Sequence, residues 1–267
     1  MVRQLYESVS YRFGLLIGVF LMVSLVAFSY PPAKEFYEIR IYHLKDKAQE
    51  DRVDQFLQTA FLPALHKNGI KKVGVFKPVG NDTAADRRIF VLIPFNSLQQ
   101  VTSIGQRLEK DPAFTSAGKD YFEAPFNNPP YTRIETIHLE AFPDMPQMQL
   151  PALKGPKSER VYELRSYESA TENLHISKVK MFNEGGEIRI FKKLGFNAVF
   201  YARAISGSYM PNLMYMTTFE NKAVRDEHWK AFFADPEFVK LAAMPEYKNT
   251  VSKNVTMFLE PVDYSDY

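Results

Sequence analysis

Apolar and polar residues alternate along a strand that the chain contains twice. The first copy lies in "FYEIRIYHLK" at residues 36–45, and the second in "VYELRSYESA" at residues 161–170. Alternation with a period of two is typical of a β-strand with one buried face. The two faces carry Tyr37, Ile39 and Ile41 against Glu38, Arg40 and Tyr42 in the first copy, and Tyr162, Leu164 and Ser166 against Glu163, Arg165 and Tyr167 in the second.

Other landmarks recur in the same order, which indicates an internal duplication. They are "DPAF" at 111–114 with "DPEF" at 235–238, and "HLEAF" at 138–142 with "FLEPV" at 258–262. A proline-rich stretch, "PDMPQMQLPALKGPK", separates the two sets. The sequence therefore predicts a first repeat at residues 36–142, a linker at residues 143–160 and a second repeat at residues 161–263.

Each repeat is predicted to run strand, helix, strand, strand, helix, strand. The first helix of repeat one is marked by apolar residues at helical spacing, namely Val53, Phe56, Leu57, Ala60, Phe61, Ala64 and Leu65. In repeat two, Gly185 and Gly186 interrupt the corresponding segment, so a broken helix is expected there. A βαββαβ unit is the ferredoxin-like arrangement, an α+β fold with helices on one face of its sheet. Because the other face needs a cover, we expect the two sheets to pack together as a pseudo-dimeric α/β barrel.

Three passages carry a family resemblance. They are the Tyr-Glu-(Ile/Leu)-Arg-x-Tyr strands, "NLMYMTTFEN" at residues 212–221, and "RDEHWKAFFADPEF" at residues 225–238. Together they resemble the NIPSNAP family of the dimeric α/β-barrel group. The resemblance covers residues 36–263 and is strongest in repeat two, since repeat one has "GQRLEKDPAF" in place of the passage that contains Trp229. It implies the barrel fold but no defined activity.

The charge balance and the cysteine count exclude several classes of partner and chemistry. The 33 basic and 31 acidic residues give a net charge of +2, so no electrostatic footprint for nucleic acid is present. The chain has no cysteine, which excludes disulfides, thiolate catalysis and zinc sites with Cys ligands.

The beginning of the sequence predicts an export segment at residues 1–29. Residues 13–29 contain no charged side chain and follow Arg3 and Arg12. Ala27 and Ser29 place small residues before a possible cleavage, and a membrane span of about 20 residues is the alternative to a cleaved signal. A buried core helix is a third interpretation. The first two place the rest of the chain in a periplasmic or extracellular location, with membrane contact only through residues 13–29 if these are retained.

The polar face of the repeated strand supplies the candidate site. If this face is buried, the guanidinium group needs a carboxylate partner, and a Glu two residues away provides one. The pair then serves only the structure, or it forms part of a polar pocket in which Arg awaits an anionic or carbonyl-bearing ligand and Tyr donates a hydrogen bond. The candidate pocket residues are Glu38, Arg40, Tyr42, Glu163, Arg165, Tyr167, Tyr201, Tyr215, His228 and Trp229. For the last four, ordinary packing is the competing interpretation.

Motifs for metal, phosphate or nucleophilic chemistry are missing. The sequence has no phosphate-binding loop, GxSxG or HExxH. The five histidines, His43, His66, His138, His175 and His228, are scattered, so no metal site and no cofactor are expected. A haem with one of them as axial ligand stays possible, but the sequence does not select which.

Three functions fit these observations. The first is non-catalytic binding of a small molecule or a protein partner. The second is a monooxygenase-like barrel enzyme that acts on an aromatic or haem-type substrate. The third is a structural or assembly module, and a homo-oligomer is compatible with each.

Overall fold

The structure, a computed structural model, describes residues 32–267, so the expected export segment at residues 1–29 lies outside the described residues. Every helix and strand of the described fold lies within Ala33–Tyr267. Within residues 32–267, none of the helices combines enough length with enough apolar character to cross a membrane.

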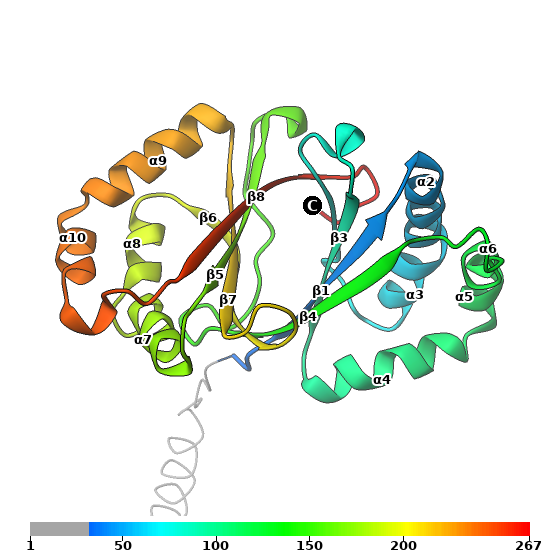
Figure 1. Cartoon of the computed structure of the whole chain (residues 1–267), viewed down its shortest axis with the longest axis horizontal. Helices are drawn as coiled ribbons and strands as arrows, with labels where there is room; N and C mark the ends of the chain where they lie inside the picture. Colours follow the sequence, from blue (N-terminus) through cyan, green and yellow to red (C-terminus); the bar gives the residue numbers. More distant parts are fainter. Residues whose placement is uncertain (1–31) are drawn as a thin grey trace, which may run out of the picture. The chain divides into compact units, whose positions relative to one another are not determined.

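Eight antiparallel strands close into a barrel, which confirms the expected α/β barrel (Figure 1). The strands are β1 (Phe36–Leu44), β2 (Gly74–Pro78), β3 (Arg87–Phe95), β4 (Arg133–Ala141), β5 (Val161–Glu168), β6 (Asn197–Ser206), β7 (Asn212–Phe219) and β8 (Lys253–Pro261). Their order around the barrel is β1-β3-β2-β8-β5-β7-β6-β4. The two sets of four strands are therefore joined edge to edge, at β2–β8 and at β4–β6, rather than stacked as separate sheets. This pairing engages both outer strands of each set, since an open edge would leave backbone donors and acceptors unpaired.

Helices cover the outside of the barrel in two groups, one beside each set of four strands (Figure 1). The first group is α2 (Lys47–Phe56), the π-helical turn η2 (Leu57–Phe61), α3 (Leu62–Lys67), α4 (Leu98–Glu109), α5 (Pro112–Ala117) and α6 (Lys119–Phe122). The second group is α7 (Glu172–Phe182), α8 (Glu187–Lys193), α9 (Lys222–Ala234) and α10 (Pro236–Ala242). Short 3-10 turns are η3 (Asn81–Thr83), η4 (Lys157–Glu159) and η5 (Pro245–Tyr247).

The expected break in the first helix of the second half is confirmed between α7 and α8. Gly186 has φ +83°, a left-handed conformation that glycine adopts without steric cost. A Cβ atom at Gly185 would lie 2.6 Å from the carbonyl oxygen of Met181, so the chain leaves α7 by an approach that only glycine permits. The turn therefore sets where α8 begins.

The core has three parts, divided by the wall of the barrel. The interior is filled by buried apolar side chains from all eight strands, among them Tyr37, Phe76, Leu139, Tyr162, Phe200 and Met216. Two further clusters lie between the outside of the barrel and each group of helices. Since side chains alternate along a strand, the faces that carry Glu38 and Glu163 point outward, under the helices.

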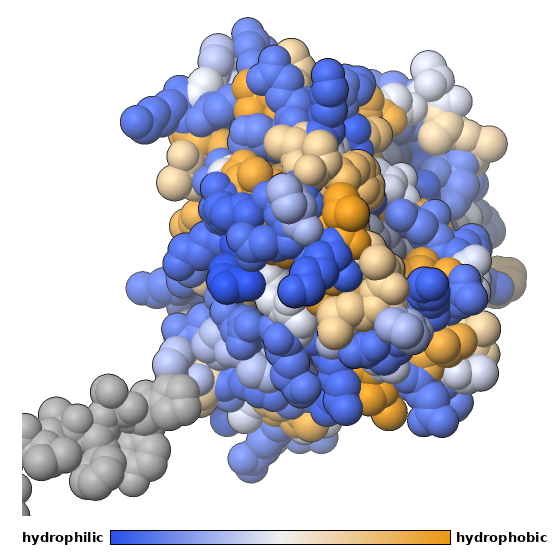
Figure 2. Space-filling view, turned by 90° about the vertical axis from the view of Figure 1, so that its left-hand side faces the viewer, coloured by the Kyte–Doolittle hydropathy of each residue, from blue (hydrophilic) through white to orange (hydrophobic). Residues whose placement is uncertain are grey.

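The outer face of the second helix group is mostly hydrophilic, with hydrophobic residues in smaller areas among them (Figure 2). The large apolar side chains that are exposed on these helices are Ile176, Phe233 and Val239.

Candidate functional site

In the second half, four of the predicted site residues and one unpredicted arginine form a cluster around Glu163, which is fully buried. Arg165 Nε donates to Glu163 Oε1 at 2.6 Å. Arg225, on α9, donates through Nε and Nη2 to the two carboxylate oxygens, each at 2.8 Å. Trp229 Nε1 donates to Oε2 at 2.9 Å. The carboxylate therefore connects β5 to α9 through charge-assisted hydrogen bonds.

Arg165 is held on every side by protein groups. Its guanidinium carbon lies 3.9 Å from the ring centroid of Trp229, a cation–π contact. Its Nη1 donates to the Tyr167 hydroxyl at 3.2 Å, and that hydroxyl lies 2.8 Å from the hydroxyl of Tyr215. Burial by itself would raise the pKa of Glu163, but the donors from Arg225, Arg165 and Trp229 lower it below its ordinary value. The arrangement satisfies its own charges, which favours the structural interpretation of the Glu–Arg pair.

The first half holds the same pair with different neighbours. Arg40 Nη2 lies 2.7 Å from Glu38 Oε1, and the guanidinium lies 5.0 Å from the ring centroid of Phe61. Tyr42 packs edge-on against Tyr121 and Tyr131 instead of joining a hydroxyl pair. By the alignment of "DPAF" with "DPEF", Gly105 stands where the second half has Trp229, and a Cβ there would meet no atom within 4 Å. The aromatic contact to Arg40 thus comes from the first helical segment rather than from α4.

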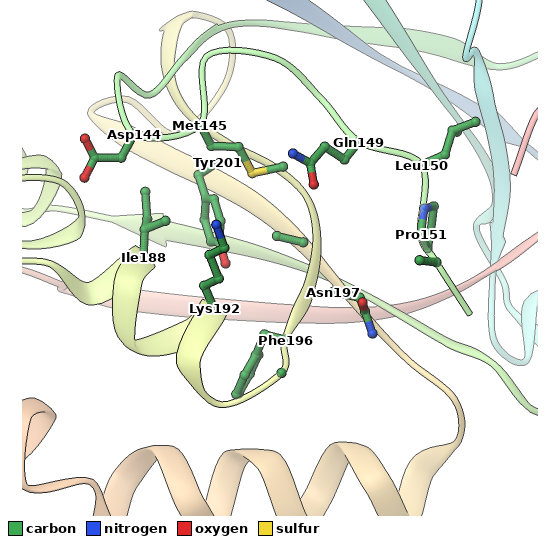
Figure 3. Close-up of a pocket in the computed structure, with 13 residues that line it drawn as sticks. Asp144, Met145, Gln149, Leu150, Pro151, Ile188, Lys192, Phe196, Asn197 and Tyr201 are labelled. Atoms are coloured by element: carbon green, nitrogen blue, oxygen red, sulfur yellow. The ribbon is translucent and has the colours of Figure 1, made fainter. Parts of the chain in front are cut away.

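Tyr201 packs against Tyr215 of the Glu163 cluster, with 5.5 Å between the ring centroids, and lines a cavity. The cavity has a volume of about 340 Å³ and lies between residues 144–152 of the linker and the segment from α8 into β6. Tyr201 is 2% exposed, and burial together with the Glu187 carboxylate raises its pKa, so its hydroxyl stays a hydrogen-bond donor at neutral pH. Figure 3 shows Met145 and Gln149 from the linker, Ile188 and Lys192 from α8, and Phe196 from the turn before β6 around it.

Backbone hydrogen bonds fix the linker wall of this cavity. Phe142 N donates to Tyr201 O, and Gln149 N donates to Val199 O, each at 2.9 Å. Asp144 N donates to the side chain of Asn183, which follows α7. The cavity is therefore preformed, because its two walls are bonded to each other at both ends.

A buried ion pair joins α7 to α8 next to the cavity. Lys178 Nζ of α7 lies 2.8 Å from Glu187 Oε2 of α8, and both residues are buried. The same amine lies 4.8 Å from the ring centroid of Phe182. Because Glu187 and Ile188 are neighbours, this pair fixes the start of α8 and with it one side of the cavity.

The structure thus divides the ten predicted site residues into three groups. Glu163, Arg165, Tyr167, Tyr215 and Trp229 are joined, Glu38 and Arg40 form a second pair with Tyr42 beside it, and Tyr201 lines the cavity. His228 joins none of these, and it packs against Phe196 and Phe219.

The sequence prediction missed Arg225, Lys192 and Gln149. Arg225 could have been found, since it precedes Trp229 by four residues and therefore shares its helix face. No sequence signal marks the other two. Among residues 32–267, no group of three or more His, Asp or Glu side chains is placed to hold a metal ion.

Solved structures with a similar fold come from proteins of very different sequence. A proposed monooxygenase from Fusobacterium nucleatum has a TM-score of 0.54 and 6% identity, over 86% of this chain and 93% of that one. A proposed monooxygenase from Lactobacillus acidophilus has a TM-score of 0.53 and 9% identity, over 85% and 94%. At such identities the likeness concerns the fold alone. No curated protein matches the chain.

The family comparison bears on the second half of the chain. The model of the NIPSNAP family matches residues 162–266, which include nearly all of β5 and everything from α7 to β8. A NIPSNAP family protein of unknown function from Agrobacterium tumefaciens aligns at 17% identity with 41% of this chain and 95% of its own, with a TM-score of 0.35. The resemblance to the NIPSNAP family is therefore confirmed for residues 162–266, which match the model of that family's domain.

Proposed function

We propose that this NIPSNAP-domain barrel binds a small organic ligand, without catalysis, in the cavity between the linker and the segment from α8 to β6. The observation that carries the proposal is a preformed cavity of about 340 Å³ with the Tyr201 phenol in its wall. Ligand pockets have volumes of about 300–1,000 Å³ and combine apolar walls with a few polar groups. This cavity fits the lower end of that range.

The lining defines the class of ligand. Met145, Ile188 and Phe196 supply apolar surface, while Lys192 supplies a positive charge, Asp144 a negative charge and Tyr201 a hydroxyl donor. Flat apolar contacts favour an aromatic body, and an amine with a phenol favours an anionic group such as a carboxylate. The ligand is therefore a small aromatic or otherwise flat carboxylate.

The duplicated architecture explains why this cavity occurs beside the second half. We infer that residues 36–142 and 161–263 are two tandem ferredoxin-like repeats, since each contributes strand, helices, two strands, helices and strand in that order. Only the second repeat is preceded by the linker at 143–160, and the linker supplies one wall of the cavity. We also propose that the barrel is exported, because residues 13–29 contain no charged side chain and follow two arginines, as in an export signal.

Binding is tested by calorimetry of the purified full chain with 2-naphthoate and with its neutral analogue 2-naphthamide. Lys192→Gln should weaken 2-naphthoate binding about 10-fold, because a hydrogen bond to a charged group contributes about 1.5–3 kcal/mol. Binding of the amide should change little. Lys230→Gln, the same substitution on an exposed residue of α9, is the matched control and should leave both affinities unchanged.

The proposal is wrong if neither compound binds and native mass spectrometry finds no small molecule bound to the purified chain. Equal effects of Lys192→Gln and Lys230→Gln would remove the cavity as the place of binding. Tyr201→Phe gives a second check, since it deletes only the hydroxyl and should weaken both compounds.

An enzymatic function is the second candidate. Its support is the barrel fold shared with two proposed monooxygenases, together with a phenol in the cavity wall. Oxygen uptake with an aromatic substrate that depends on Tyr201, or a haem absorption band in the purified protein, would favour it over binding alone.

A further inference from the structure

Three polar side chains lie in a row across neighbouring strands at the seam where β4 pairs with β6. His138 on β4 is opposite Glu38 on β1 and opposite Ser206 on β6. His138 Nδ1 lies 2.9 Å from Ser206 Oγ, and its Nε2 lies 3.4 Å from Glu38 Oε2. A carboxylate, an imidazole and a hydroxyl in this order are the components of an activated serine.

The charge of Glu38 determines which nitrogen of His138 carries the proton. Burial would raise the pKa of Glu38, but the contacts with His138 and Arg40 lower it, so the carboxylate is ionised at neutral pH. An ionised carboxylate facing Nε2 favours the tautomer with its proton on Nε2. Nδ1 is then an acceptor, and the Ser206 hydroxyl donates to it. His138 is thereby oriented as a base toward Ser206.

The backbone places these side chains with two local irregularities. The register of β4 against β6 shifts between His138 and Leu139, and such bulges re-aim a side chain. Gly207, directly after Ser206, has φ +137°, and a Cβ there would lie 3.1 Å from the Cα of Ile137. Glycine at this position therefore lets the chain after Ser206 pass close to β4, beside His138.

The other seam shows that the fold does not require this row. There the counterpart of Glu38 is Glu163, whose opposite residue on β8 is Phe258. Beyond it the β2 chain continues with Val79, whose backbone N–H donates to Phe258 O. Barrel closure is thus achieved without a histidine or a serine, so His138 and Ser206 need another explanation.

We propose that Ser206 is a nucleophile toward small, activated acyl and phosphoryl esters, with His138 as its base and Glu38 as the positioning carboxylate. The Oγ–acyl bond forms while Nδ1 takes the hydroxyl proton. The bond to the leaving alcohol then breaks as that alcohol receives the proton, and water hydrolyses the acyl-serine by the reverse proton path. Ser206 is exposed and the His138 side chain is 28% exposed, so esters reach the row from solvent.

The test uses a fluorophosphonate probe on the purified full chain, with intact-mass and peptide analysis. The probe forms an Oγ–P bond and releases fluoride, while His138 takes the proton. We expect one added probe, located on Ser206. General-base assistance contributes about 10²–10⁴-fold, so His138→Gln should slow labelling at least 10-fold.

Ser206→Ala should abolish labelling, and Ser208→Ala, two residues further along in the hairpin between β6 and β7, is the matched control that should label normally. Thermal melts of all variants identify any loss of fold. If Glu38, His138 and Ser206 had only a structural role, the variants would lose stability without a selective change in labelling rate. Absence of labelling in the unmodified chain, labelling at another residue, or equal rates with and without His138 would overturn the proposal.

Discussion

At the residue scale, the same Glu–Arg pair has acquired different partners in the two halves. Glu163 accepts hydrogen bonds from Arg165, Arg225 and Trp229, whereas Glu38 is paired with Arg40 and faces His138. Removal of one partner from a buried ion pair leaves an uncompensated charge. The pair in the second half therefore serves to hold β5 against α9.

Arg165→Ala should destabilise the barrel by about 3 kcal/mol, because it removes one partner of a buried ion pair. The value lies at the lower end of the usual range, since Arg225 and Trp229 still pair with Glu163. Urea unfolding followed by circular dichroism measures the change. Arg203→Ala, which breaks an exposed pair with Glu140, is the control and should cost at most about 1 kcal/mol. Equal costs for the two variants would favour an open, ligand-binding arginine at Arg165.

At the element scale, capping residues and one ion pair join the helices that form one side of the cavity. Asn221 caps α9 by accepting from Val224 N at 3.0 Å. Asp235 accepts from Glu237 N at the start of α10 and pairs with Lys193 of α8 at 2.6 Å. These contacts join α8, α9 and α10, so the side of the cavity that α8 forms does not depend on α8 alone.

Glu220 holds the linker in place and should control its accessibility to proteases. Its carboxylate accepts from the backbone N–H groups of Lys154 and Gly155, at 2.9 and 2.6 Å, and these bonds lower its pKa. Glu220→Ala removes the carboxylate that accepts from both amides, so trypsin should cut after Lys154 or Lys157 faster than in the unmodified chain. Glu227→Ala, on the exposed side of α9, is the control. Unchanged cleavage in the first variant would show that the linker is held by other contacts.

At the scale of the whole molecule, each half depends on the other for barrel closure. The pairs β2–β8 and β4–β6 join the halves, and the segment after β8 extends the contact, since Asp266 N donates to Val73 O. The Asp266 carboxylate also accepts from Val73 N at 2.7 Å. Tyr267 packs against Phe76 from β2 and Tyr162 from β5.

Residues 33–150 alone should therefore aggregate or form homodimers. Separation exposes two unpaired strand edges, β2 and β4, and the apolar inner face of the sheet. A homodimer would close the barrel with two copies of the same half. Light scattering of the fragment distinguishes these states from a folded monodisperse monomer, which would contradict the dependence of one half on the other.

The sequence by itself determined the strands, the break at Gly185–Gly186 and the barrel, because period-two alternation, glycine positions and a repeated pattern act locally or through repetition. It also identified Glu163, Arg165 and Trp229 as candidates, since residue type and spacing were sufficient for that. Only the tertiary structure decided which side chains meet. Pairing of β4 with β6 brings His138 to Ser206, and a backbone hydrogen bond from Gln149 N to Val199 O brings the linker to the cavity that Tyr201 lines. Such pairings depend on register around the whole barrel, and no local pattern specifies that register.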